Sequence, residues 1–516
     1  MTTESLDVQP VADRALGRQL VHNSIATGIY YGLSLVVGLW FTRYTVHTLG
    51  IALLAVVSLA SGFIAYLQFV TTGIGASVGR YVLADYAVGD TDAANRTFNS
   101  YLVAAERVSL ILLAVIAGIV WFLVPHLDYP QGQLGATRFV FAAILGSTVI
   151  QVWSLCFDSA IWVSGRIDIR NGIYALELLV RTGTVVALFT VSQPQIWHIG
   201  LANLIASLLS LSLYFTAWKK LTPELTIDRS LFDPKRYRKL SGMGGWLAVM
   251  QGGGMMQFNS DMLLLNVMLG REIQGSYGLL LSWVNILRGL FASMGQLVSP
   301  SLAALQASED SVKLSELSSK AVRMQGLLIS IPVGVLCGLA GPALNWWLGP
   351  NFVFLAPLAW LVLVPLVMEG SFYPAFILIQ THEAIAFTAI ATAIVGVTNI
   401  LLGIALVKFT SFGMYGIAIA VAATSLIRHA IVLPAYAARV LGQPWYLFIQ
   451  QQSQVAIQLG VTGVIAFFVA QQMTSNRSFI QLLTAAIVAG GISAGLALVQ
   501  LSQDERGRLL AIVRRR

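Results

Sequence analysis

Residues 103–125 read VAAERVSLILLAVIAGIVWFLVP, and this stretch decides the class of fold. A helix needs about 20 mostly apolar residues to cross the hydrocarbon core of a bilayer, and this stretch is long enough. Its charged side chains, Glu106 and Arg107, both lie close to its start. Comparable apolar runs recur along the whole chain, so the sequence predicts an all-α, polytopic membrane protein.

Composition supports the same conclusion. The chain has 516 residues, of which 57% are hydrophobic and 10% are charged, and its mean hydropathy is +0.76. Soluble proteins are typically about 25% charged. Lipid must therefore contact much of the exterior. The two cysteines, Cys156 and Cys337, lie in apolar runs, and their spacing is not that of a disulfide framework or a metal site.

The apolar runs predict about fourteen transmembrane helices. Residues 1–17 carry acidic side chains and no apolar segment, so the first run is expected to be a retained span rather than a signal peptide. The predicted spans are 22–43, 50–75, 103–125, 137–161, 171–192, 196–218, 242–268, 274–300, 324–348, 354–380, 384–407, 412–435, 451–473 and 478–501.

Basic residues indicate how these helices are oriented. Of the 31 lysines and arginines, 22 fall in the tails and loops on one side of the membrane, and 5 fall in the loops on the other side. The remaining four lie within or at the edge of spans. Because lysine and arginine collect in cytoplasmic loops, both termini are predicted to be cytoplasmic. The net charge of +8 is explained by this orientation, and nucleic-acid binding is not expected.

A weak internal repeat divides the chain into two halves. A shift of about 220 residues brings several glycines and acids of the first half onto the second without a gap: Gly50 onto Gly270, Gly75 onto Gly295 and Asp90 onto Asp310. Parallel repeats are a transporter design, with the substrate site between the lobes. The predicted parts are an N-lobe of six helices (1–218), a basic cytoplasmic linker (219–241), a C-lobe of six helices (242–440), and an appendage of two helices with a basic tail (441–516).

Three segments resemble the polysaccharide flippases, which move lipid-linked oligosaccharides. They are LGIALLAVVSLASGFIAYLQFVTTGIGASVGRYVL (49–83), FNSDMLLLNVMLGREIQGSYGLLLSW (258–283) and VTNILLGIALVKFTSFGMYGIAIAVAATS (397–425). The residues that carry the resemblance are Gly50, Gly73, Gly75, Arg80, Tyr81, Asp261, Gly270, Gly275, Tyr277, Asn399, Gly413 and Gly416. This family belongs to the multidrug/oligosaccharidyl-lipid/polysaccharide (MOP) exporter superfamily.

The resemblance implies two lobes around a hydrated cavity, with alternating access. The expected substrate is an undecaprenyl-diphosphate-linked repeat unit of a lipopolysaccharide or exopolysaccharide, moved from the inner to the outer leaflet of the bacterial inner membrane. Expected partners are this lipid-linked oligosaccharide, membrane lipids, and a polysaccharide polymerase with its chain-length machinery. No cofactor is expected, and coupling to protons or sodium is left open.

Two other functions compete with this interpretation. The same fold also serves multidrug exporters and exporters of a peptidoglycan precursor, lipid II. A membrane polysaccharide polymerase is a weaker alternative, because such enzymes carry a sizeable outer loop for their chemistry and none is predicted here. The protein is therefore expected not to be an enzyme.

Ionisable side chains inside spans are functional candidates by default. Arg288, Arg181 and Arg80 are candidate cavity cations, because arginine grips phosphate in a bidentate way. Arg288 could instead pair with an acid such as Asp261. Glu177 is a cavity candidate too, but it precedes Arg181 by four residues on one helix, which is also the spacing of a local ion pair.

Further residues are candidates for coupling and movement. Asp261 and Glu369 could bind a proton or sodium ion. The consecutive glycines Gly252, Gly253 and Gly254 suggest a hinge within the seventh span, with close helix packing as the alternative.

Aromatic and basic residues near the span ends have simpler explanations. Trp283 could stack on a sugar ring, although tryptophan more often marks the membrane interface. Arg428 is expected to extend to the interface. Asp158 is expected to join a cluster of charges near the inner mouth with Arg166, Asp168 and Arg170.

Overall fold

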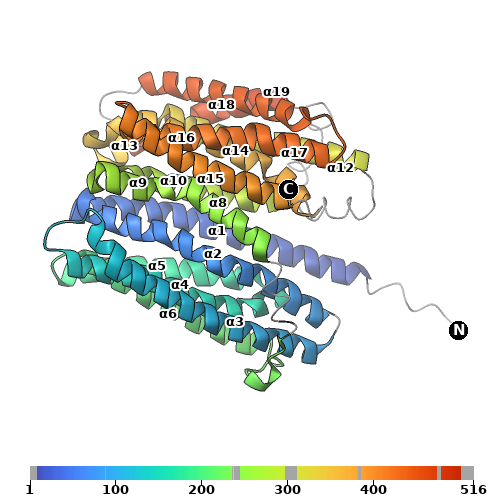
Figure 1. Cartoon of the computed structure of the whole chain (residues 1–516). Coiled ribbons are helices and arrows are strands. Elements are labelled where there is room, and N and C mark those ends of the chain that lie inside the picture. The colour runs from blue at the N-terminus through green and yellow to red at the C-terminus, as the bar shows by residue number, and fades with distance from the viewer. Residues whose placement is uncertain are drawn as a thin grey trace. The chain divides into compact units, whose positions relative to one another are not determined.

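The computed structural model describes residues 9–87, 89–234, 236, 244–296, 311–381, 385–472 and 478–500, and within these ranges it contains helices and no strands (Figure 1). The side chain of Arg80 lies outside the described residues. The chain forms two compact units. Unit 1 comprises Met1–Met255 and Gly270–Gly275, and unit 2 comprises Met256–Leu269 and Ser276–Arg516.

Unit 1 is built from six long helices. They are α1 (Gln9–Leu49), α2 (Ile51–Ala87), α3 (Thr91–Gly118), α4 (Leu134–Ser164), α5 (Ile167–Val191) and α6 (Ile196–Leu221). The helix α4 packs against α2, α3 and α6, while α5 packs against α1 and α6. The sharp turn from α4 to α5 uses Gly165, whose φ of 65° suits a residue without a Cβ.

A single asparagine ties this turn to α1. Asn23 donates to the Gly165 carbonyl at 2.9 Å and accepts from the Asp168 backbone N–H at 3.1 Å. These two bonds satisfy backbone groups that the end of α4 and the start of α5 leave free. Polar side chains of α1 therefore fix the corner between two later helices.

The segment predicted as a linker is docked onto unit 1. Its described part, residues 222–234 and 236, is here named the strap. Asn99 of α3, only 2% exposed, donates to the Thr226 carbonyl at 2.8 Å and accepts from the Asp228 backbone N–H at 2.8 Å. Asn95, one turn earlier, donates to the Glu224 carbonyl at 2.9 Å and accepts from Thr226 N–H at 2.8 Å. Each asparagine side chain thus donates to one backbone carbonyl of the strap and accepts from one backbone N–H, which is the pattern of bonds between paired strands.

Charged side chains also hold the strap. Arg229 donates to both carboxylate oxygens of Glu106 on α3, at 3.1 and 3.0 Å. Arg236 lies 2.6 Å from the Asp85 carboxylate of α2. Glu106 therefore faces the strap, at the polar end of α3, and does not belong to a membrane-buried cluster.

Unit 2 contains most of the remaining helices. They are α9 (Ser260–Leu269), α10 (Arg271–Gln296, from Ser276 onward), α12 (Ser311–Gly338), α13 (Ala340–Leu348), α14 (Ala356–Thr381), α15 (Ile385–Phe409), α16 (Met414–Leu426), α17 (Leu433–Val440), α18 (Leu447–Gln471) and α19 (Phe479–Gln500). The preceding helix, α8 (Gly244–Phe258), runs from one unit into the other, because the division falls between Met255 and Met256.

The helix α18 is closely packed within unit 2 rather than loosely appended to it. A Cβ on Gly326, Gly334 or Gly338 of α12 would come within 2.7 Å of α18 atoms. Glycines allow helix backbones to approach closely, which is how helices associate where the solvent is lipid. Gln452 of α18 adds hydrogen bonds to the Met368 carbonyl at 3.1 Å and to Ser371 Oγ at 3.0 Å on α14.

The predicted spans agree with the helices. Each of the fourteen coincides with a helical segment of the described chain, and eleven described helices are long and apolar enough to cross a membrane. The other three predicted spans, 50–75, 242–268 and 274–300, contain residues outside the described set; within that set α2 contributes the apolar segment Ile51–Leu67. The described helices α8 and α9 are separated by a break at Asn259. The all-α, polytopic class is confirmed.

Candidate functional site

An arginine–glutamate pair lies inside unit 2. Arg288 of α10 donates from Nε to Oε1 of Glu369 at 2.8 Å and from Nη2 to Oε2 at 3.2 Å. The two side chains are 32% and 19% exposed. Glu369 sits at the middle of α14, so the pair is held well away from the helix ends. The alternative in which Arg288 pairs with an acid is confirmed, although the acid is Glu369 and not the suggested Asp261.

A small polar cavity adjoins this pair. Its volume is about 40 Å³, and its polar wall includes Asp261, Tyr277, Asn285, Arg288 and Glu369. One buried water needs about 10–15 Å³ by this measure, so a few waters would fit. Asp261 is 1% exposed, and Tyr277 is fully buried beside it. The Tyr277 hydroxyl is close to the Asp261 carboxyl but makes no hydrogen bond of ordinary geometry.

Phe258, the last residue of α8, lies between two basic side chains. The Arg288 guanidinium carbon is 4.4 Å from the centre of the Phe258 ring. The His429 ring stacks on the same phenylalanine at 6.4 Å, with an interplanar angle of 21°. A cation over an aromatic face is attracted by the electron density of the ring. The Phe258 ring therefore stabilises the positive charge of Arg288 through this contact.

The end of α8 is anchored by two other helices. Gln257, fully buried, offers its backbone carbonyl to Asn399 of α15 at 3.0 Å and its side-chain oxygen to Arg428 at 2.7 Å. The helix breaks two residues later, at Asn259, and these bonds satisfy groups that a helix end exposes. Arg428 is only 6% exposed, so its expected extension to the membrane interface was wrong.

Arg428 and His429 occupy a widened helical turn. Residues Ile427–Val432 form a π-helix between α16 and α17. Pro434, which has no N–H to continue an α-helical ladder, follows two residues later. Single π-turns inside α-helices are frequent at functional sites. Here the turn places two basic side chains beside the pair and the end of α8.

This arrangement combines two arginines with two carboxylates in an apolar surrounding. Arginines present planar donors that match phosphate or carboxylate oxygens. The carboxylates of Asp261 and Glu369 are the ligands that a proton or a hard cation would use. Among the described residues, no group of three or more His, Cys, Asp or Glu side chains is arranged to hold a metal ion. The site suits reversible binding of charged groups.

The candidate residues of unit 1 make fewer contacts with one another than those around Arg288. Glu177 and Arg181 are both described and form no ion pair with one another within 4.0 Å. The predicted cluster near the inner mouth exists as separate contacts. Arg166 pairs with Asp168 at 2.9 Å, whereas Asp158 accepts from Trp162 at 3.0 Å and lies 4.0 Å from Arg170. Of these contacts, Asp158–Arg170 connects α4 with α5, Asp158–Trp162 lies within α4, and Arg166–Asp168 lies at the start of α5. They have the character of structural bonds.

Trp283 is packed inside unit 2. It is 7% exposed, and its ring lies 5.3 Å from that of Trp347. Its Nε1–H is buried without a hydrogen-bond partner. A ring covered in this way offers no free face to a sugar in the described conformation.

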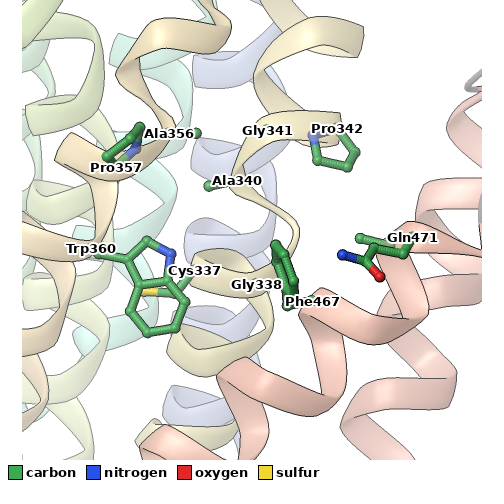
Figure 2. Close-up of a pocket in the computed structure, with 11 residues that line it drawn as sticks. Cys337, Gly338, Ala340, Gly341, Pro342, Ala356, Pro357, Trp360, Phe467 and Gln471 are labelled. Atoms are coloured by element: carbon green, nitrogen blue, oxygen red, sulfur yellow. The ribbon is translucent and has the colours of Figure 1, made fainter.

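A larger groove in unit 2 is almost wholly apolar. Figure 2 shows it among Trp360 of α14, Cys337 and Gly338 of α12, and Phe467 and Gln471 of α18. Its volume is about 510 Å³, and none of the described residues that line it is charged. It has no group that could bind an ion, so the polar site around Arg288 remains the better candidate.

Three residues of the polar site carry no charge and were not expected there. Phe258, Gln257 and Asn399 position the arginines, although Asn399 does belong to one of the segments that resemble the flippases. Gln257 could have been noticed as an amide directly after an apolar, glycine-rich run. A buried amide in a membrane helix requires partners, and that requirement is the available signal.

Sequence comparison identifies a relative over most of the chain. No protein-family model matches the present chain. The chain is 30% identical over 420 residues to a membrane protein of Bacillus subtilis (strain 168), described as uncharacterized membrane protein EpsK, and the match covers 81% of this chain and 83% of that protein. The chain belongs to the EpsK family. That relative is described as a membrane protein, which agrees with the apolar helices of the present chain.

The present chain also resembles solved structures in its fold. The lipid II flippase MurJ in an inward closed conformation matches with a TM-score of 0.65 and 16% identity, over 92% of this chain and 98% of MurJ. An inward-facing multidrug resistance MATE transporter of the MOP superfamily matches with a TM-score of 0.59 and 14% identity, over 85% and 98%. The chain therefore has the fold of these transporters and flippases, as the resemblance to the MOP superfamily predicted.

Proposed function

We propose that this protein moves a lipid-linked saccharide, carried on a polyprenyl diphosphate, from the inner to the outer leaflet of a bacterial inner membrane. The observation that supports this most is Arg288, a guanidinium held within the bundle of unit 2 in the wall of a small polar cavity. A diphosphate cannot cross hydrocarbon unpaired, because desolvating its charge is too costly. An arginine in a partly polar interior lowers that cost.

The remaining expectations are part of the same proposal. The termini are cytoplasmic, movement follows alternating access, and Gly252, Gly253 and Gly254 provide the hinge. The division between units directly after these glycines, at Met255, supports that hinge. Asp261 or Glu369 takes up the coupling proton or sodium ion. A polysaccharide polymerase and chain-length proteins receive the product, and the protein itself catalyses no covalent step.

A second candidate is an exporter of cationic drugs. The two carboxylates of the site, Asp261 and Glu369, favour it, since either could receive an organic cation. The two candidates differ in the charge of their substrate. Export of a cationic dye by cells that express the protein, without restoration of any surface polymer, would favour the second.

Complementation tests the first candidate. A flippase-null strain should recover its surface polymer with the wild-type gene and should not recover it with Arg288→Ala. Arg229→Ala, at an exposed pair of unit 1, is the matched control and should complement fully. Membrane levels and thermal unfolding of each variant separate loss of transport from loss of protein. Full complementation by a stably produced Arg288→Ala protein would refute the role of this arginine.

A further inference from the structure

The donor edge of Arg288 is already occupied. Glu369 takes Nε and Nη2, which form one of the edges through which a guanidinium can grip a phosphate in bidentate fashion. The protein's own carboxylate thus stands where a substrate anion would bind. An incoming anion can bind Arg288 in this way only when Glu369 leaves it.

Glu369 needs another partner when it leaves. Removing one member of a buried ion pair is strongly unfavourable, because the other charge remains uncompensated. Arg428 is another basic neighbour: it interacts electrostatically with Glu369, is 6% exposed, and has a buried Nε–H without a hydrogen-bond partner. Arg428 therefore has a donor free to receive the carboxylate.

We propose that Glu369 is an exchangeable counter-ion, bound to Arg288 in the unloaded protein and passed to Arg428 when a phosphate group takes Arg288. The proposal deepens the proposed function, on which it rests for the identity of the phosphate compound. Its geometry stands on the pair, on the free donor of Arg428, and on the shared contact of Arg288 and His429 with Phe258.

The exchange has a consequence for α8. Arg428 also donates from Nη1 to Gln257, the residue that holds the end of α8. A carboxylate arriving at Arg428 competes with the Gln257 side chain for that guanidinium. Binding of an anion at Arg288 is therefore expected to weaken the Arg428–Gln257 bond at the end of α8, a few residues after Gly252–Gly254. This gives the substrate site a direct connection to the expected hinge.

Binding measurements on the purified full-length protein test the exchange. The probes are inorganic pyrophosphate and a short-chain polyprenyl diphosphate, each with calorimetry as the readout. Glu369→Gln removes the competing carboxylate, so it should bind both probes about tenfold more tightly than wild type. Arg428→Gln removes the acceptor, so it should bind them about tenfold more weakly. The double variant should bind as tightly as Glu369→Gln alone, because no carboxylate then needs an acceptor.

Controls keep this result interpretable. Glu106→Gln removes a carboxylate that pairs with an exposed arginine of unit 1 and should leave both affinities unchanged. Arg428→Lys retains the positive charge and should restore part of the lost affinity. Thermal unfolding of each variant establishes that the folded protein is being measured.

The outcomes separate this inference from the proposed function. Independent, additive effects of Glu369→Gln and Arg428→Gln, or unchanged affinity in Glu369→Gln, would overturn the exchange while leaving flippase activity open. Exchange behaviour with pyrophosphate, together with no binding of the polyprenyl compound, would support the exchange and count against the proposed substrate. Binding of neither probe by the wild-type protein would refute both.

Discussion

Two arginine–glutamate pairs with similar bond lengths lie in different surroundings. In unit 1, Arg229 grips both oxygens of Glu106 at 3.1 and 3.0 Å, with side chains 81% and 43% exposed. In unit 2, Arg288 grips Glu369 at 2.8 and 3.2 Å, with side chains 32% and 19% exposed. Water stabilises the separated charges of the first pair but not those of the second. The surroundings, and not the bond lengths, decide what each pair contributes.

The largest effect is expected at the pair of unit 2. Arg288→Ala should lower the free energy of unfolding by about 3 kcal/mol, because it breaks a largely buried pair and leaves Glu369 to Arg428, which already bonds to Gln257. The double variant Arg288→Met/Glu369→Leu should recover most of that loss, since an apolar pair has no charge to desolvate. Unfolding in detergent micelles measures both. A double variant no more stable than Arg288→Ala would contradict the importance of burial.

The next effect compares two buried amides. Gln325 of α12, 6% exposed, donates to the Phe291 carbonyl at 3.0 Å and to the Gly370 carbonyl at 2.9 Å. Gln325→Ala should cost about 2–3 kcal/mol, because it removes bonds to two other helices and leaves buried carbonyls unsatisfied. Unfolding midpoints in denaturant provide the measurement. A loss smaller than that of Asn99→Ala would reverse the expected order.

Asn99→Ala should cost about 1 kcal/mol in unit 1. The change removes the bonds to Thr226 and Asp228, but strap groups that are released can bind water. The more sensitive readout is limited trypsin cleavage at Arg229, which should become faster. Wild-type cleavage kinetics in this variant would show that the neighbouring asparagine suffices to hold the strap.

Arg229→Ala should have a small effect on stability. An exposed pair typically contributes about 0–1 kcal/mol and is weakened by salt. The difference between wild type and variant should therefore shrink further in high salt, as followed by thermal unfolding. A salt-independent loss of several kcal/mol would mean that this pair behaves like the one in unit 2.

The smallest effect concerns pH. Tyr86 donates to the Glu224 carboxylate at 2.6 Å, and this bond holds the pKa of Glu224 below its ordinary value of 4.5. Because the folded-state pKa is lowered, the contribution is present above about pH 4.5 and is lost as the pH falls through the folded-state value. Strap cleavage by an acid protease should rise over that range in wild type. Tyr86→Phe should cleave faster at neutral pH and change less with acid.

The sequence predicted the helices better than their contacts. Span positions follow from local hydropathy, which requires no knowledge of partners, and all fourteen matched a helix. The partner of Arg288 is 81 residues away in the chain, and choosing Glu369 over Asp261 depends on the rotation of α10 and α14 about their axes. Hydropathy alone does not fix that rotation, because side chains on several faces of a membrane helix are apolar.

The strap shows a second limit. Its basic charge predicted a linker between the two lobes, but its docking onto α3 depends on bonds from neutral asparagines to backbone groups. Any sequence presents backbone N–H and carbonyl groups, so such contacts leave little trace in the residues of the strap. The signal is on α3 instead, where two asparagines occur four residues apart on one helix face.

The glycines of α12 that contact α18 determine when unit 2 can complete its packing during synthesis. When Gly326, Gly334 and Gly338 enter the membrane, α18 has not yet been translated, so this small-residue stripe first meets lipid or a protein of the insertion machinery. The close backbone approach that it permits becomes available only after more than a hundred further residues. Unit 2 is thus completed only after α12 has entered the membrane. A chain released before α18 is made would leave the three glycines of α12 without their packing partner.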